Sequence, residues 1–407
     1  MAFRPPISLL MAFLSDFSFS TSPTSLRRSS SACRTAANPS DAWGPRKPSR
    51  VRTNSGSLRI RAISNIPTFN LIPTPCVEAR QTFCRSGGNP LNTPVRKPVL
   101  RGAVLDLGSN TFKLLLAEQS GSTLRIHHEK AYPVRLGEGV ARTGRLQPQR
   151  LQRALSVLRN LQRKVSAFAP QQTVAVATGT LRRAKNARSF LRPASGILQN
   201  PIQLLSGHEE GRLIALAARN LSRGTKPRFH LDLGGGSLEV IDSLRPTRPR
   251  IFSLNLGCVA VRDTLLPDHP PSPDQWEKAV GKIRRALQRL PNPVRRPDAT
   301  FSGGTGHAYA CLLRKKNMKA RKLEGFPLTG NHLETLLLRL LPLSLHQLES
   351  LPGMPRDRAS VAIPAFLVLR ETMRKLGLSH VRLTTHGLRY GVWLDRLSPK
   401  PVSRIVR

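Results

Sequence analysis

Two short stretches of the chain repeat one order of apolar and polar positions. In the first, an apolar run ends in Asp106, turns through glycine and continues as a second apolar run. The same order recurs 126 positions later around Asp232. Apolar runs joined by a short glycine turn are typical of β-hairpins. The pattern predicts one hairpin over 103–107 with 111–118 and another over 229–233 with 238–241.

The rest of the chain beyond residue 98 alternates between helical and strand periodicity. Apolar residues at helical spacing run from Pro148 to Phe168, and the opposite side of that helix is basic and solvated. A second amphipathic pattern runs from Ser206 to Leu221. Further strands are predicted at 173–177, 202–205, 251–256, immediately before Ser302, and at 381–384, with helices over 181–191 and after Pro273. This mixture indicates an α/β chain of two lobes.

Residues 1–97 lack such periodicity and are rich in Ser, Pro, Arg and Thr. A segment of this kind buries too little apolar surface to offset the entropy of ordering, so we predict that it is disordered. Its first 28 residues are rich in Ser and poor in acids, which resembles an organellar transit peptide. The sequence thus predicts a 1–97 extension, a first lobe over 98–212 and a second lobe over 213–407.

The balance of charge is strongly basic. Lys and Arg number 65 against 23 Asp and Glu, which gives a net charge of +42, of which residues 98–407 carry +31. A domain this basic repels itself unless polyanions are near, so a polyanionic partner is predicted. Nucleic acid, polyphosphate and anionic lipid all satisfy the charge.

Cellular setting is inferred from what the sequence lacks. No apolar run reaches the length of about 18 residues that a membrane span needs, so none is predicted. The five cysteines form no CxxC pair and no even framework, which is typical of reduced thiols. We therefore expect a cytoplasmic protein, or an organellar one if the first residues are a transit peptide.

Three glycine-containing loops follow predicted strands. Such loops offer backbone N–H groups to a phosphate without a Cβ in the way. Phosphoryl transfer needs these donors and a divalent cation to neutralise charge, and carboxylates are the hard ligands that Mg²⁺ takes. The candidate phosphate-binding residues are Gly108, Ser109, Asn110, Gly234, Gly235, Gly236, Ser237, Gly303, Gly304 and Thr305. The candidate Mg²⁺ ligands are Asp106, Asp232 and Glu239.

Two adjacent glutamates open the helix that starts at Ser206. Ser206 and Glu209 match a capping box, with the Ser as N-cap and Glu209 reaching back to its N–H. Glu210 has no capping role and is a candidate base for activating water. The alternative is a plain acid favoured by the helix dipole. Arg182, in the turn after the 173–177 strand, is a candidate phosphate contact.

Taken in order, these blocks resemble the exopolyphosphatase and guanosine pentaphosphate phosphohydrolase family (Ppx/GppA), over residues 103 to about 393. The resemblance implies an actin, Hsp70 and sugar-kinase type of fold with two ribonuclease-H-like lobes and an active site between them. It also implies that Glu210 is catalytic and that Asp232 and Glu239 serve the metal. The blocks that carry it are 106–112, 177–186, 205–213, 232–239, 253–259 and 303–305.

The chain departs from this family's pattern at three places. Gly211 stands where Ala is usual, Arg358-Ala359-Ser360 lacks the acid of Arg-x-Asp, and 385–391 keeps only its Gly-Leu-Arg-x-Gly core. We expect the last two segments to lie outside the phosphate site.

The function predicted from the sequence is a Mg²⁺-dependent exopolyphosphatase, because a strongly basic catalytic region suits a long polyanion. The alternatives are guanosine pentaphosphate hydrolysis, a non-catalytic sensor of nucleotide or polyphosphate, and a nucleic-acid-binding protein. A homodimer is left open.

Overall fold

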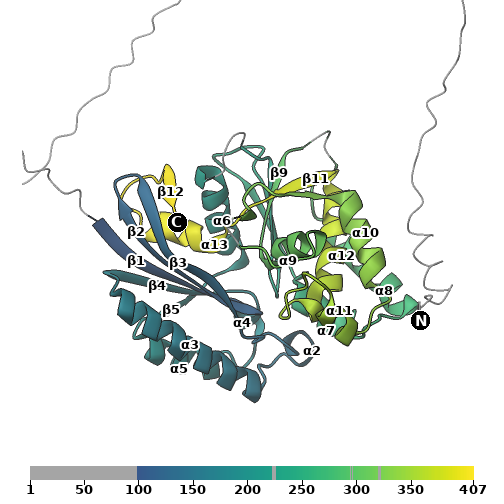
Figure 1. Ribbon diagram of the computed structural model, residues 1–407, viewed down its shortest axis with the longest axis horizontal. Coiled ribbons are helices and arrows are strands. Elements are labelled where there is room, and N and C mark those ends of the chain that lie inside the picture. Colours follow the sequence, from purple (N-terminus) through teal and green to yellow (C-terminus); the bar gives the residue numbers. More distant parts are fainter. Residues whose placement is uncertain (1–98, 222–225, 294, 296, 320–321) are drawn as a thin grey trace, which may run out of the picture. The chain divides into compact units, whose positions relative to one another are not determined.

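The structure is a computed structural model that describes residues 99–221, 226–293, 295, 297–319 and 322–407 (Figure 1). The predicted extension over 1–97 lies outside these ranges. One six-stranded sheet has the order β12-β3-β2-β1-β4-β5. Its strands are β1 (Val99–Leu107), β2 (Thr111–Ser120), β3 (Thr123–Pro133), β4 (Gln172–Ala177), β5 (Ile202–Leu204) and β12 (Arg404–Val406).

A second six-stranded sheet has the order β10-β11-β9-β6-β7-β8. Its strands are β6 (Phe229–Leu233), β7 (Leu238–Asp242), β8 (Arg250–Leu254), β9 (Ala299–Ser302), β10 (Pro327–Thr329) and β11 (His380–Leu383). In each sheet three consecutive antiparallel strands are followed by two strands parallel to the first. This shared order confirms the predicted pair of ribonuclease-H-like lobes and both predicted hairpins.

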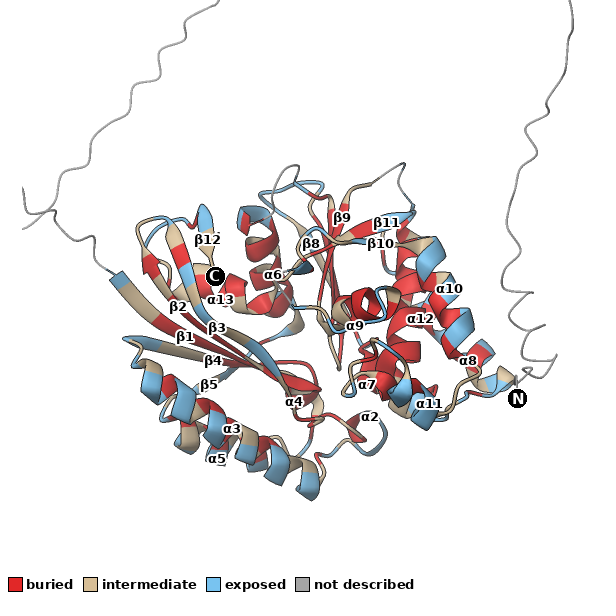
Figure 2. Ribbon diagram, viewed as in Figure 1, coloured by how far each residue is buried: buried red, intermediate tan, exposed pale blue. Residues whose placement is uncertain are grey.

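Helices cover both faces of the first sheet, which is why its central strand β1 is buried along most of its length. Helices α3 (Pro148–Phe168) and α5 (Arg188–Leu198) pack on one face through an apolar cluster that includes Leu105, Phe112 and Leu158. The buried stripe of each helix faces the sheet and its exposed residues face outward (Figure 2).

The opposite face of the first sheet packs against two helices that also contact the second lobe. These are α6 (Gly207–Leu221) and α13 (Leu388–Arg396), and their apolar residues join strand residues of both lobes in one cluster. The second sheet has its own, larger core with six further helices. They are α7 (Cys258–Thr264), α8 (Pro273–Leu287), α9 (Gly304–Leu313), α10 (Gly330–Leu340), α11 (Leu345–Ser350) and α12 (Ala359–Leu376).

The two lobes differ in extent from the expected division. The expected boundary between residues 212 and 213 falls inside α6, which is one unbroken helix with a continuous apolar stripe. Near the C-terminus, α13 packs on the first sheet and β12 pairs with β3. The first lobe therefore includes the last segment of the chain, which the sequence analysis placed in the second.

The helix predicted over 181–191 is two helices, α4 (Thr180–Arg183) and α5. Between them Asn186 binds the backbone of a distant loop, accepting from Leu146 N at 2.7 Å and donating to Leu146 O at 3.0 Å. The backbone at Ala184 is extended, which ends α4. In the described part of the chain, no helix is long and apolar enough to cross a membrane.

Candidate active site

The turns of the two hairpins have the same internal geometry. In the first, Gly108 N donates to Thr111 O at 3.2 Å, and in the second, Gly234 N donates to Ser237 O at 3.0 Å. Each turn follows the central strand of its own sheet. The remaining backbone N–H groups of the two turns are therefore available to a ligand between the lobes.

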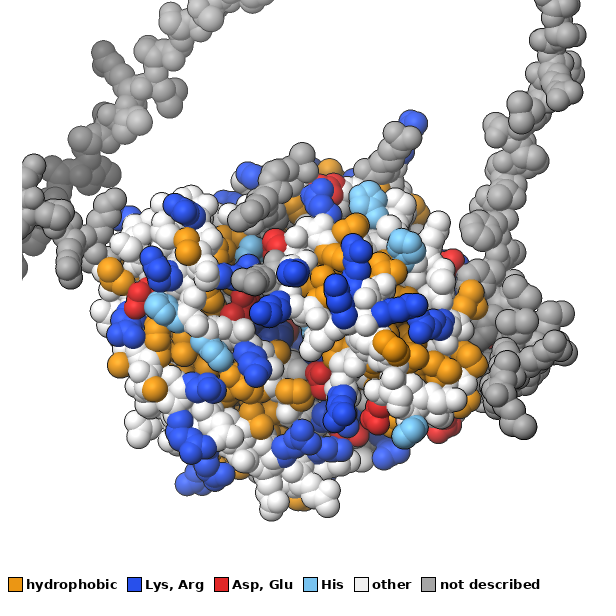
Figure 3. Space-filling model, in the orientation of Figure 1, with side chains coloured by type: hydrophobic (Ala, Val, Ile, Leu, Met, Phe, Trp, Pro, Cys, Tyr) orange, Lys and Arg blue, Asp and Glu red, His pale blue; other side chains and the backbone are white. Residues whose placement is uncertain are grey.

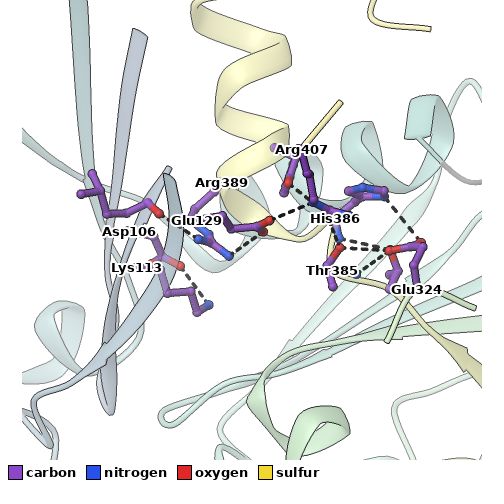
Figure 4. Close-up of polar contacts among 11 residues, drawn as sticks. Asp106, Lys113, Glu129, Glu324, Thr385, His386, Arg389 and Arg407 are labelled. Carbon is purple, nitrogen blue, oxygen red and sulfur yellow. Dashed lines mark hydrogen bonds and ion pairs between the residues drawn. The ribbon is translucent and has the colours of Figure 1, made fainter. Parts of the chain in front are cut away.

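The repeat extends into the strands that carry the turns. Asp106 faces Lys113 across the first hairpin, and Asp232 faces Glu239 across the second, in the same register. Lys113 Nζ lies 3.0 Å from Asp106 Oδ2 (Figure 4). The two halves of the site are thus alike in backbone but differ in charge. Lys113 in the first hairpin occupies the position that Glu239 occupies in the second.

Glycine allows the two turns to lie against each other. A side chain at Gly236 would come within 2.9 Å of Ser109 Oγ and 3.1 Å of Thr180 N, and one at Gly257 would collide with the Gly236 backbone. Arg183 crosses the same gap and donates to Gly236 O at 2.9 Å. On this side the turns of the two lobes are in direct contact.

A cavity of about 50 Å³ lies between the turns, and we call it the central cavity. Its lining includes twelve of the candidates: Asp106, Gly108, Ser109, Asn110, Glu210, Asp232, Gly234, Gly235, Gly236, Ser237, Gly303 and Gly304. Three candidates do not line it. Thr305 is buried in α9, Glu239 is buried in β7 with its Oε1 accepting from Ser253 Oγ at 3.0 Å, and Arg182 donates to Glu210.

The two adjacent glutamates have different surroundings. Glu210 is 8% exposed, lines the central cavity and accepts from Arg182 Nη1 at 2.7 Å. Burial raises the pKa of Glu210 to about 7, although Arg182 opposes the shift. Glu209 points away and accepts from Arg212 at 2.9 Å, which lowers its pKa.

The predicted capping box is only half formed. Ser206 Oγ accepts from Glu209 N at 3.0 Å, as an N-cap does. The Glu209 carboxylate does not return to Ser206, because Arg212 and Arg396 bind it instead. The expectation that Glu209 completes the box was wrong, whereas the prediction that the two glutamates differ in role fits their positions.

A buried row of polar side chains ends at Asp232. Ser302 Oγ hydrogen-bonds Asp232 Oδ2, His230 Nε2 lies 3.0 Å from Ser302 Oγ, and His230 Nδ1 lies 2.7 Å from Thr300 Oγ1. Burial lowers the pKa of His230 to about 4, so the ring is neutral. Because Ser302 donates to the carboxylate, the ring must donate to Ser302 and accept from Thr300. The row fixes one oxygen of Asp232.

A divalent cation fits the two aspartates at the ends of β1 and β6. Both line the central cavity, and the charge of Asp106 contributes to raising the pKa of Asp232 after the larger effect of burial. A cation would relieve this repulsion. Among the described residues, no three His, Cys, Asp or Glu side chains form a metal cluster, so the set with Glu239 is not assembled. Mg²⁺ usually takes one or two carboxylates together with substrate phosphates.

Two segments expected outside the site contribute to it. Arg358 lines the central cavity. Its guanidinium lies so close to Gly304 that a side chain at that position would collide with it. Leu388 also lines the cavity, and a side chain at Gly387 would lie 3.2 Å from Asp232 Oδ2. The expectation that these two segments lie outside the phosphate site was wrong. They are distant from the turns in sequence, and only the folding of the chain places them beside the turns. Lys113 was also missed, although it lies 126 positions before Glu239.

Comparison with known proteins was made on this fold and site. The model of the Ppx/GppA phosphatase family matches residues 115–399. A Ppx/GppA enzyme of Aquifex aeolicus is 25% identical over 74% of this chain and 100% of its own, with a TM-score of 0.62. An exopolyphosphatase of Cytophaga hutchinsonii shares the fold at 19% identity, with 72% and 96% covered and a TM-score of 0.62. An exopolyphosphatase-like protein shares it at 22%, with 73% and 97% covered and a TM-score of 0.67. The chain belongs to the Ppx/GppA phosphatase family.

Proposed function

We propose that this phosphatase is an exopolyphosphatase, which releases terminal orthophosphate from polyphosphate by attack of water. The observation that carries the proposal is the position of Glu210. Its carboxylate is buried, lines a cavity between two phosphate-binding turns and is held by Arg182 at 2.7 Å. A carboxylate with a pKa near 7 accepts a proton from water at neutral pH far better than an exposed glutamate does.

The other groups of the cavity supply binding and charge. The turn N–H groups hold the oxygens of the terminal phosphoryl group, and Arg358 and Lys113 face the same space. Mg²⁺, held by Asp106 and Asp232, would neutralise charge on the phosphate oxygens. Glu210 orients the water and takes its proton, and Arg182 keeps the carboxylate in place.

A larger hollow of about 620 Å³ continues from the central cavity, and the two share Lys113, Asp232 and Arg358 among their lining residues. We call it the basic groove, after its cations: Lys113, Lys130, Lys319, Arg358 and Arg389. Glu129 in its wall is neutralised by Arg389 and Arg407, each at 3.3 Å (Figure 4). Asp357, also in the wall, is paired with Arg358 at 3.3 Å, and Lys113 is paired with Asp106 at 3.0 Å. Lys130 and Lys319 form no ion pair with a described acidic residue, and their charge suits the next phosphates of a chain whose end lies in the cavity.

The wall of the basic groove favours polyphosphate over a guanosine nucleotide. None of the described residues that line it is Phe, Tyr or Trp, so no such ring is present to stack on a base. Five of its polar side chains are cationic donors, which recognise phosphate and carry no preference for guanine.

The test is phosphate release by the purified full chain with Mg²⁺. The substrates are long-chain polyphosphate, tripolyphosphate, guanosine pentaphosphate and ATP at equal concentration of chain ends. We expect kcat/KM for long polyphosphate to exceed that for guanosine pentaphosphate by about tenfold or more, since about 1.4 kcal/mol of extra contact gives a factor of ten. A reversed ratio assigns the nucleotide as substrate. Binding of polyphosphate without release of phosphate from any substrate assigns a sensor.

A further inference from the structure

One long segment of the first lobe contains no acidic residue. Between Glu138 and Glu209 the chain has ten Arg and two Lys but neither Asp nor Glu. The segment includes α3 and α5, which together form the outer layer on one face of the first sheet (Figure 1). The outer surface of these helices therefore has a positive charge that no residue of the segment itself offsets.

The basic side chains of the two helices point outward. Six are exposed, and we call their surface the α3/α5 face: Arg153, Arg159, Arg163, Lys164, Arg188 and Arg192. None of the six forms an ion pair with a described acidic residue, since the acids nearest in sequence are bound elsewhere, Glu138 by Arg150 and Glu209 by Arg212. In Figure 3, Lys and Arg side chains gather over the region where Figure 1 places α3.

The α3/α5 face is separate from the proposed substrate path. None of its six cations lines the central cavity or the basic groove. The side of the cavity toward α4 is closed by Arg183, which binds Gly236 O at 2.9 Å and Asn255 Oδ1 at 2.6 Å. A polyphosphate whose end lies in the cavity would continue along the basic groove and would not reach the α3/α5 face. The positive charge of this face therefore serves another polyanion.

The composition of the face selects among polyanions. The exposed large apolar residues of the described chain all lie outside α3 and α5, so the face has nothing to insert into a lipid surface. Its only partly exposed ring, Phe168, is covered by Arg101 at 4.5 Å and is not free to stack on an unpaired base. Five of the six cations are Arg, whose planar fork matches phosphate oxygens.

We infer that the α3/α5 face binds double-helical nucleic acid through its phosphate backbone, without reading sequence. Helix α3 has 21 residues and is about 31 Å long at 1.5 Å per residue, which spans about nine phosphates of one strand at 3.4 Å spacing. Up to six cations would contact phosphates. The slope of log Kobs against log salt would then approach about −5.

The experiment measures binding of a fluorescent 24-base-pair duplex, as RNA and as DNA, to the full chain by anisotropy across a salt series. The variant R153Q/R159Q/R163Q/K164Q removes four charges of α3, and Gln keeps helix propensity. The matched control K278Q/K282Q/R285Q/R289Q removes four exposed charges on and just after α8 of the second lobe. Circular dichroism and melting temperature establish that both are folded.

We expect the α3 variant to bind the duplex about tenfold or more weaker, with a salt slope reduced by about 3 to 4, while the control is near wild type. An equal loss in both variants means that only net charge matters and overturns the inference. The inference is also overturned if the wild-type chain binds polyphosphate or anionic vesicles but not the duplex, and the α3 variant alone loses that binding. The duplex measurement involves no turnover, so its outcome is independent of the proposed activity.

Discussion

At the scale of single residues, Glu209 and Glu210 allow a matched test of catalysis. Both stand in the first turn of α6, but only Glu210 reaches the central cavity. We expect Glu210→Gln to lower kcat by about 10²- to 10⁴-fold, the range typical of a lost general base. Glu209→Gln loses a partly exposed ion pair with Arg212 and is expected to stay within about threefold. Steady-state phosphate release checks both, and equal losses would contradict a distinct role for Glu210.

The raised pKa of Glu210 also predicts a pH-dependent cost in stability. Burial moves this pKa from 4.5 to about 7, so the folded chain holds the proton more tightly than the unfolded chain. The contribution of Glu210 to stability is complete below pH 4.5 and is lost as pH rises toward 7. Glu210→Gln does not ionise, so its free energy of unfolding relative to wild type should increase from pH 5 to pH 8. Urea unfolding without Mg²⁺ measures this, and a constant difference across that range would refute it.

Ser302 is expected to affect metal use through Asp232. Ser302→Ala removes the hydroxyl between Asp232 and His230, which leaves buried polar atoms of both without that partner. We expect a loss of about 1 to 3 kcal/mol in stability and a higher Mn²⁺ concentration for half-saturation, read by electron paramagnetic resonance. Thr300→Val, at the far end of the row, serves as the control and should change metal affinity less. Unchanged Mn²⁺ binding in Ser302→Ala would show that the row is only structural.

The sequence predicted residues of the site where they lie within a repeated local pattern. Asp106 and Asp232 lie near the ends of strands and the turn glycines follow those strands at equal offsets, so their meeting between two lobes could be inferred. Arg358 could not be found in this way, because only the packing of α12 against the second lobe brings it to Gly304. Glu239 shares the repeat but accepts from Ser253 and does not line the central cavity, which spacing along a strand does not show.

At the scale of elements, α6 connects the lobes and carries Glu210, so its packing sets the position of the base. It lies against β8, where Gly211 faces Ile251. An alanine is usual at this position in the family that the sequence resembles, but here a Cβ would collide with Ile251 Cγ2. Glycine at 211 and isoleucine at 251 are therefore a matched pair in this chain.

This pairing predicts that Gly211→Ala destabilises the protein despite the better helix propensity of alanine. The propensity gain of about 1 kcal/mol is opposed by an overpacking cost of about 1 to 3 kcal/mol. In an Ile251→Ala background the collision is absent, so the same substitution should be neutral or stabilising. A double-mutant cycle by urea unfolding measures the coupling. Additive effects would show that the helix shifts to make room.

Elements with strong periodicity were predicted, and those formed by tertiary pairing were not. The long helix α3 and both hairpins follow from their apolar spacing. Strand β3 was missed, because its run of His127, His128, Glu129 and Lys130 has no clear alternation, and it is held by pairing with β2. Strands β10 and β12, of three residues each, were also missed, whereas β5 of the same length was predicted.

At the scale of the whole described molecule, the lobes touch on two sides of the central cavity. Arg183 joins them at the turns, and Gly139 N donates to Asp263 Oδ2 at 2.6 Å between α2 (Val140–Thr143) and α7. On the other side Arg407, the residue after β12, donates to Thr385 Oγ1 at 2.8 Å (Figure 4). Thr385 also lines the basic groove, so this contact bounds the opening that we propose for the substrate.

The basic groove predicts how salt acts on substrates of different length. A long polyphosphate in the cavity would also contact groove cations such as Lys130 and Lys319 and displace their counterions, whereas tripolyphosphate would reach fewer of them. We expect KM for long chains to rise steeply between about 50 and 200 mM salt, while kcat changes little. The fold-increase in KM should be about tenfold larger for long chains than for tripolyphosphate. Lys130→Gln should reduce the slope for long chains and leave tripolyphosphate unaffected, and the α3 variant should change neither. Equal slopes for the two substrates would remove the groove from the substrate path, because a chain that crosses several cations cannot have the salt dependence of one that crosses few.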